Sequence, residues 1–313
     1  MYIALAIAPV FAVMVLGYAL RRAGLPDESF WPQADRLVYW VLMPVLLFHM
    51  NSTVSFSGDL AAGFAFVLIV AFFGVALLIF LACRALRIEP AVTSTVLQGA
   101  LRHNAFIALA ICESLMGRAG LEMATLAMSI LALVTNVSIV PMLIGLLPRP
   151  PGMSVGRRVL KDTVKNPIIL GIFAGLMTNL VTDGPIPGIH DATGIVGRAA
   201  LPMMLICVGA SLSFSGARGK LLPVMLSMAG KFLIFPALVV ALALWLSLDE
   251  PGITILLVFG AMSTANAGLA LARQLGGDAP LMSTIIAAQT TLVFVTLPVS
   301  ILLVRLVMNA LRL

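Results

Sequence analysis

Long apolar runs separated by short polar segments are the feature that most restricts what this chain can fold into. A helix that crosses a bilayer needs about 20 consecutive apolar residues. Ten runs approach that length: 1–20, 37–50, 60–83, 90–112, 123–147, 166–182, 199–214, 221–248, 253–272 and 281–304. Only 10% of the 313 residues are charged, whereas a soluble domain carries about 25%. The sequence therefore predicts an all-α polytopic membrane protein embedded in the lipid bilayer.

The 19 Lys and Arg residues indicate how these runs are oriented. If the N-terminus lies outside, most of the cations fall in loops on the inner side, as the positive-inside rule requires. Arg102 and Lys231 lie inside predicted spans, and the outer side holds only Arg118, Arg198, Arg305 and Arg312. We therefore expect both termini outside. The net charge of +6 then calls for no nucleic-acid partner.

The chain divides into two halves that repeat one plan. Pro9 and Pro167, Gly17 and Gly175, and Pro44 and Pro202 are pairs with the same spacing, in the same order. We predict a first five-helix repeat at 1–147, a connector on the inner side at 148–165, and a second repeat at 166–313. Because each repeat has an odd number of spans, the second enters the membrane upside down relative to the first. Inverted repeats of this kind are typical of secondary transporters.

A polar interruption occurs once in each half. Arg102, His103 and Asn104 stand together in the fourth run. The segment Asn104-Ala-Phe-Ile-Ala-Leu-Ala110 recurs in the ninth run as Asn266-Ala-Gly-Leu-Ala-Leu-Ala272. Polar interruptions at matching places in two apolar repeats point to discontinuous helices at a transport site. Small neighbouring residues let two such helices cross closely, and each half-helix N-terminus carries about half a positive charge. The pattern predicts a carboxylate site at the crossing.

The polar residues in the runs are candidate site residues, and each has a simpler structural explanation. Arg102 attracts an anion in an aqueous cavity, or its side chain extends to the membrane interface. His103 handles protons, or it is a packed polar residue. Lys231 takes the place of a coupling cation, or it forms an ion pair or extends to the membrane interface. Asn104 and Asn266 bind substrate, or they form ordinary interhelical hydrogen bonds. The further candidates for the cavity are Asn136, Ser263, Thr264 and Gln289.

Sequence motifs of other function classes are missing. No Walker A sequence occurs, so ATP does not drive the protein directly, and no HExxH zinc-protease motif occurs. We therefore expect no enzymatic activity, no metal and no cofactor. Cys83, Cys112 and Cys207 lie in apolar runs, as structural thiols do. The leading hypothesis is a carrier for a small organic anion, and a non-transporting receptor or channel on the same scaffold is the alternative.

An ordered set of short motifs resembles the auxin efflux carrier family. The set comprises Leu37-Val-Tyr-Trp-Val-Leu-Met-Pro44-Val-Leu-Leu-Phe48, Arg102–Ala110, Lys165-Asn166-Pro167, Ala200-Leu-Pro202, Gly209-Ala-Ser-Leu212, Lys231 with Pro236, Leu271–Asp278 and Thr296-Leu-Pro298. The resemblance implies ten transmembrane helices in two inverted five-helix repeats, with broken helices four and nine crossing. It also implies a fold similar to that of the bile acid–sodium symporters, with scaffold and transport domains that each contain parts of both repeats.

The same resemblance implies a function. It implies elevator-type transport of a mono- or dicarboxylate, or of an auxin-like anion, across a bacterial inner membrane, and it is compatible with a homodimer. Asn104 then lies near the substrate carboxylate, and Asn266 lies in the ninth-helix crossing. Family members usually have proline at the crossings. Here Ala110 stands at the first such position, and Ser263, Asn266 or Gly268 at the second. We therefore expect asparagine and small residues to form the interruptions.

Overall fold

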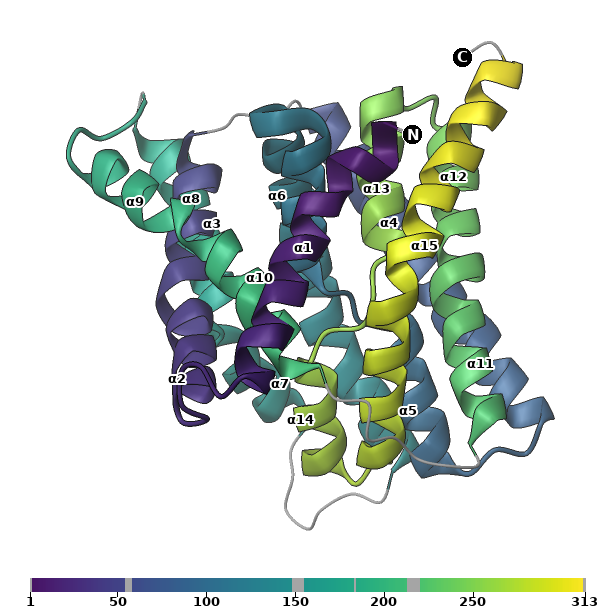
Figure 1. Ribbon diagram of the computed structural model, residues 1–313. Coiled ribbons are helices and arrows are strands. Elements are labelled where there is room, and N and C mark those ends of the chain that lie inside the picture. Colours follow the sequence, from purple (N-terminus) through teal and green to yellow (C-terminus); the bar gives the residue numbers. More distant parts are fainter. Residues whose placement is uncertain (1, 54–57, 148–154, 183, 213–219, 312–313) are drawn as a thin grey trace. The chain divides into compact units, whose positions relative to one another are not determined.

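The computed structural model describes residues 2–53, 58–147, 155–182, 184–212 and 220–311. Every regular element in these ranges is a helix (Figure 1). Six helical segments are long and apolar enough to cross a membrane, and two shorter apolar helices, Pro167–Val181 and Glu250–Gly260, accompany them. The predicted class of all-α, multi-pass membrane protein is confirmed, and the count of ten crossing helices stays a prediction.

The chain forms two compact units, and each unit combines segments from both sequence halves. Unit 1 comprises Met1–Ala61, Phe106–Leu133 and Lys161–Leu212. Unit 2 comprises Ala62–Ala105, Val134–Leu160 and Ser213–Leu313. The units therefore cut across the two predicted repeats.

Unit 1 is built around two groups of packed helices. In one group, α1 (Tyr2–Arg22) packs against α10 (Ala200–Ser211). In the other, α3 (Met43–Thr53) packs against α8 (Pro167–Val181) and α9 (Ile189–Arg198), and Figure 1 shows these three helices side by side. The remaining elements are α2 (Phe30–Leu37), the π-helical turn η1 (Val38–Leu42) and the first part of α6 (Ala105–Leu146).

Glycines bring the backbones of the paired helices in unit 1 into contact. A Cβ atom on Gly17 of α1 would overlap the carbonyl oxygen of Ile206 in α10, and a Cβ on Gly209 would overlap that of Met14. In the other group, a Cβ on Gly175 of α8 would lie 2.7 Å from the carbonyl oxygen of Phe48 in α3. Small residues at helix contacts are the usual means of close packing in membranes, where the hydrophobic effect does not drive helices together.

Unit 2 contains the elements that carry most of the predicted site. They are α4 (Gly58–Ala85), α5 (Pro90–Leu101), α11 (Leu221–Ala229), the π-helical turn η2 (Gly230–Ile234), α12 (Phe235–Trp245), α13 (Glu250–Gly260), α14 (Ala267–Leu275) and α15 (Ala279–Leu311). Helix α5 packs against α11, α14 and α15, and α12 packs against α13. Figure 1 shows α14 and α15 joined as a helical hairpin.

Two prolines expected to break or kink helices each lie just after a change in the helix. Pro44 lies in a helix that continues from Phe30 to Thr53, because the π-helical turn η1 directly precedes it. A proline removes one N–H donor and displaces the carbonyl four residues earlier, and a π turn accommodates that lost bond. Pro236 follows the other π turn, η2, in the same way. Pro202 lies in the first turn of α10, where no N–H is needed.

The helix boundaries differ from the predicted runs at two places. Helix α2 begins at Phe30, inside the segment expected to be a loop. The ninth run is two helices, α13 and α14, as expected for an interrupted helix. The fourth and fifth runs share α6, which changes direction at Gly117, a glycine with φ of 62°. A residue with a side chain rarely adopts that angle. In the connector, α7 spans Val155–Val164, and residues 148–154 lie outside the described part of the chain.

Candidate functional site

The first polar interruption is a gap between two helices. Helix α5 ends at Leu101 and α6 begins at Ala105, so Arg102, His103 and Asn104 are not helical. Arg102 has an extended backbone, with φ of −76° and ψ of 141°. His103 and Asn104 are 8% and 4% exposed, and Arg102 is half-buried. Within a membrane, such a gap is possible only where other groups bind the freed backbone atoms.

The second interruption supplies one of those groups. Helix α13 ends at Gly260 and α14 begins at Ala267, and the residues between them are not helical. The backbone N–H of Asn104 donates to the carbonyl oxygen of Ser263 at 2.7 Å. Two segments that are far apart in the sequence and were predicted from the same repeated pattern therefore touch each other in unit 2. Ser263 and Thr264 are fully buried, whereas Asn266 is exposed.

Lys231 supplies a second partner to the first interruption. Its side chain is fully buried in the π turn η2, and its Nζ donates to the carbonyl oxygen of Arg102 at 2.8 Å. The ammonium group also lies 5.6 Å from the ring centre of Phe235. Among the described residues, no carboxylate forms an ion pair with it. Lys231 thus places its Nζ at the C-terminal end of α5, where a cation is favoured by the helix dipole.

Gln289 of α15 connects both interruptions to their supporting helices. Its Nε2 donates to the carbonyl oxygen of Gly99 at 3.0 Å and to Ser227 Oγ at 3.1 Å. Its Oε1 accepts from the backbone N–H of Thr264 at 3.0 Å and lies 2.8 Å from Thr264 Oγ1. The side chain is fully buried. Because an amide has two donor hydrogens and one acceptor oxygen, these four contacts use its whole hydrogen-bonding capacity.

Several other polar atoms around the first interruption have no partner. Both ring nitrogens of His103, both amide atoms of Gln98 and the hydroxyl of Ser263 are buried without a hydrogen bond in the described part of the protein. His103 instead packs edge-on against Phe235, with ring centres 4.7 Å apart. A buried polar atom without a partner costs about 1–3 kcal/mol, and such atoms in native proteins call for a bound molecule or a functional role. The interruption therefore offers donors and acceptors to a ligand or to water.

The electrostatic character of this region is positive. Helices α6 and α14 both begin at the interruptions, and a helix N-terminus attracts anions. The side chain of Arg102 lies next to α14, because a Cβ on Gly268 would be 3.6 Å from Arg102 Cδ. Arg102 and Lys231 supply two basic side chains at the interruptions. Helices α6 and α14 supply two helix N-termini there. Such a set of groups favours a carboxylate or another small anion.

The structure brings most, but not all, of the predicted residues together. Contacts within unit 2 connect seven of them: Arg102, His103, Asn104, Lys231, Ser263, Thr264 and Gln289. Asn266 directly precedes α14 and is exposed. Asn136 lies in the later part of α6 and is half-buried. Ala110, at the expected proline position, lies inside α6, so the interruption comes before it.

Sequence reasoning missed Gly99, Ser227 and Gln98. A Cβ on Gly99 would overlap Ser227 Oγ and lie 2.8 Å from Ile285 Cγ2, so only glycine lets α5, α11 and α15 meet here. A serine in a helix and a glycine in an apolar run are common, and neither forms a recognisable pattern. The sequence did offer one signal for Gln98: it is a glutamine that stands one helical turn before a polar interruption.

Comparison with known proteins gives a family match in the second half of the chain. Residues 150–301 match the family described as membrane transport protein. That match includes Lys231, the second interruption and Gln289, and it leaves the first interruption outside. A search of curated proteins finds no match to the chain. Residues 150–301 of this chain are therefore similar to the membrane transport protein family, which is the family of the auxin efflux carriers.

Proposed function

We propose that the protein is a secondary transporter that carries a small organic anion, a mono- or dicarboxylate or an auxin-like acid, across a bacterial inner membrane. The observation that carries this proposal is the contact between the two helix interruptions, where the Asn104 N–H donates to the Ser263 carbonyl. Discontinuous helices that meet at one point are how membrane carriers expose backbone groups to a substrate. A carboxylate there accepts hydrogen bonds from Asn104 and Asn266, and Arg102 supplies the attraction.

Lys231 has a distinct role in this proposal. Carriers built on discontinuous helices often bind a metal cation at the carbonyl ends of the half-helices. In this protein, the ammonium group of Lys231 is already bound to the carbonyl oxygen of Arg102. With its amine protonated, Lys231 supplies a cation at this place and makes Na⁺ unnecessary there. His103, buried and without a hydrogen-bond partner, is the candidate for coupling to protons.

We further propose ten crossing helices in two inverted repeats and an elevator-type movement of one unit against the bilayer. The packing in unit 1 supports the repeat. Gly17 contacts the carbonyl of Ile206, and Gly175 contacts the carbonyl of Phe48. The spacing from Gly17 to Gly175 equals that from Phe48 to Ile206, so each contact is the other with the two halves exchanged. Two units that each combine both halves are what a moving domain and a fixed domain require.

Flux in proteoliposomes tests the site. We expect malonate or indole-3-acetate uptake to fall at least about tenfold in Asn104→Ala and in Asn266→Ala, since each removes a group that binds the carboxylate. Asn179→Ala, which changes an asparagine of α8 in unit 1, is the matched control. Undiminished flux of every tested acid in both site variants would contradict the assignment.

Counterflow separates a carrier from a receptor or channel. A carrier loaded with unlabelled substrate exchanges it for labelled substrate and accumulates label transiently above equilibrium. A receptor binds without exchange, and a channel equilibrates without that overshoot. Binding of a carboxylate without any exchange would show that the protein is a receptor on a transporter scaffold.

A further inference from the structure

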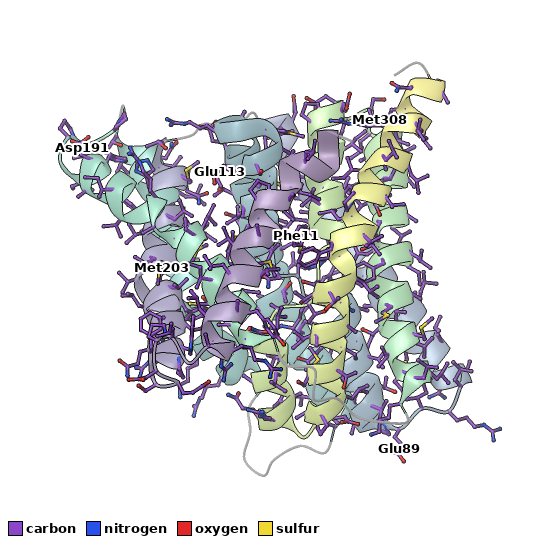
Figure 2. All side chains as sticks on the ribbon, in the orientation of Figure 1. Phe11, Glu89, Glu113, Asp191, Met203 and Met308 are labelled. Atoms are coloured by element: carbon purple, nitrogen blue, oxygen red, sulfur yellow. The ribbon has the colours of Figure 1, made fainter. Side chains whose placement is uncertain are left out.

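Unit 1 contains a cavity that the proposed transport site does not use. Its volume is about 910 Å³, and α3, α6, α9, α10 and Pro185 line it. Pockets of about 300–1,000 Å³ are the size of small-molecule sites. Six ionisable side chains face it: His49, Glu113, Arg118, His190, Asp191 and Arg198. Figure 2 labels two of them, Glu113 and Asp191, near the same end of unit 1.

The hydrogen bonds of His190 fix its tautomer. The backbone N–H of Ile186 donates to His190 Nδ1 at 2.7 Å, and the carbonyl oxygen of Ile186 lies farther from the same nitrogen, at 3.1 Å. The shorter bond requires a lone pair on Nδ1, so the ring proton is on Nε2. That proton is donated to Ser52 Oγ at 2.9 Å, and the Ser52 hydroxyl in turn donates to the carbonyl oxygen of His49. His190 is 5% exposed. Both of its nitrogens are therefore occupied, and its role is structural.

His49 has the opposite tautomer and one nitrogen left over. Its Nδ1 lies 3.1 Å from Thr193 Oγ1, and the hydroxyl proton of Thr193 is donated to the carbonyl of Ile189 at 2.8 Å. Because a hydroxyl has one proton, Thr193 must accept from Nδ1–H. The lone pair of His49 is then on Nε2. The ring lies against Gly194, where a Cβ would be 3.7 Å from Nε2, so Nε2 is at the α9 wall of the cavity.

The charged side chains around His49 differ in whether a partner within the described part of the protein binds them. Arg118 is paired with Glu122 at 2.8 Å, and the Asp191 carboxylate accepts from the Gly188 N–H at 2.9 Å. Arg198 and Glu113, by contrast, form no ion pair in the described part of the chain. Arg198 and His190 belong to α9, Glu113 belongs to α6, and His49 reaches the α9 wall from α3. Within the described part of the protein, this wall therefore has a guanidinium that forms no ion pair, next to the basic nitrogen of His49.

We propose that this cavity is a second carboxylate-binding site, at which Arg198 binds the anion and His49 Nε2 takes up one proton with it. The guanidinium matches a carboxylate in shape and charge, and the imidazolium formed on protonation donates a second hydrogen bond. Aliphatic side chains, Leu46 and Met50 of α3 among them, suit the apolar part of an organic acid. Ionised Glu113 opposes binding, so its protonation acts in the same direction as that of His49. The site is in unit 1 and does not depend on the proposed function.

Nitrogen NMR of histidine tests this proposal directly. The chain has three histidines, so the ¹⁵N-histidine spectrum of the full-length protein in detergent has three sets of signals, which His49→Gln, His103→Gln and His190→Gln assign. Without ligand, we expect the Nδ1–H tautomer for His49 and the Nε2–H tautomer for His190. Malonate should convert His49 to imidazolium and leave the His190 signals unchanged. Because one proton binds with each anion, affinity should fall by up to about tenfold per pH unit between pH about 6 and about 8.

Variants separate this site from the transport site. Arg198→Gln should abolish the malonate effect on His49, while Arg118→Gln, which changes a paired arginine in the same cavity, should retain most of it. Glu113→Gln should strengthen binding. Unchanged His190 signals show that each variant is folded. The double variant Asn104→Ala, Asn266→Ala should keep the effect on His49 even where flux is lost. The proposal is wrong if malonate leaves His49 unchanged, if Arg198→Gln binds equally well, or if equimolar chloride gives the same change.

Discussion

Two opposing free-energy terms act on the buried side chain of Lys231: the cost of desolvating its ammonium group and the gain from its hydrogen bond. Moving an ammonium group out of water costs several kcal/mol, and a hydrogen bond from a charged donor returns about 1.5–3 kcal/mol. Its hydrogen-bond partner among the described residues is the carbonyl oxygen of Arg102. A side chain that costs more than it returns in stability is retained for another reason, and we propose that this reason is the charge it supplies beside the first interruption.

Lys231→Met should therefore uncouple stability from transport. We expect the melting temperature of the purified protein to stay the same or rise, because methionine fills the space without the cost of burying a charge. Carboxylate flux should fall at least about tenfold, because the positive charge is lost from the site. Lys220→Met is the control, since Lys220 is a part-exposed lysine of the same unit paired with Asp278. Normal flux in Lys231→Met would rule out the cation role.

Gln289→Leu should mainly affect stability. The substitution leaves the Thr264 N–H without an acceptor in a fully buried place and removes the bonds to Gly99 and Ser227. We expect a loss of about 2–4 kcal/mol in unfolding free energy, measured by thermal unfolding. Thr296→Val on the same helix removes one exposed bond to the Leu292 carbonyl and should cost under about 1 kcal/mol. Equal losses in the two variants would contradict the role of Gln289.

Gln289 also shows what single residues reveal in a sequence. A glutamine in an apolar run predicts a polar role, but its partners come from α5, α11 and the segment before α14. Those partners are set by tertiary packing and leave no local pattern. Direct contact of Gln289 with substrate stays a prediction, and its amide is already fully bonded within the protein.

The helices themselves were predicted well where the signal is a repeated polar pattern. Asn104 and Asn266 indicated both interruptions, and the chain leaves the helix at Arg102–Asn104 and again before Ala267. Proline indicated an irregular turn but not its type. Pro44 predicts a break or kink, and the π turn η1 ends directly before the helix that contains it. A π turn depends on which carbonyls find partners in the folded protein, so periodicity does not predict it.

Gly209→Ala should separate α1 from α10. The added methyl group would overlap the backbone carbonyl of Met14, and backbone cannot move aside as a flexible side chain does. We expect a loss of at least about 1–3 kcal/mol in thermal unfolding. Gly145→Ala is the matched control, because a Cβ there meets nothing within 4 Å and alanine is the better helix former by about 1 kcal/mol. A neutral Gly209→Ala would mean that the two helices are not in backbone contact.

Above the level of helices, the sequence halves and the compact units are different divisions of the molecule. Each unit takes segments from before and after the connector. A repeat in sequence records which segments resemble each other, whereas a unit records which segments pack together. The division into units can be seen only in the folded chain. Composition and spacing predicted the two repeats, but they did not predict that α6 would be shared between both units.

The orientation predicted for the chain from its charges can be tested with thiols. Cys83, Cys112 and Cys207 are buried, so replacing them with alanine gives a background for single cysteines. The positive-inside rule places Arg118 outside and Arg157 of the connector inside. In intact cells, a membrane-impermeant maleimide should therefore label Arg118→Cys, and Arg157→Cys should react only after the membrane is opened. If Arg157→Cys is labelled from outside, the charge bias does not set the topology. If both positions are labelled from the same side, the number of crossings between them is even, and the odd number of spans per half that makes the repeat inverted is lost.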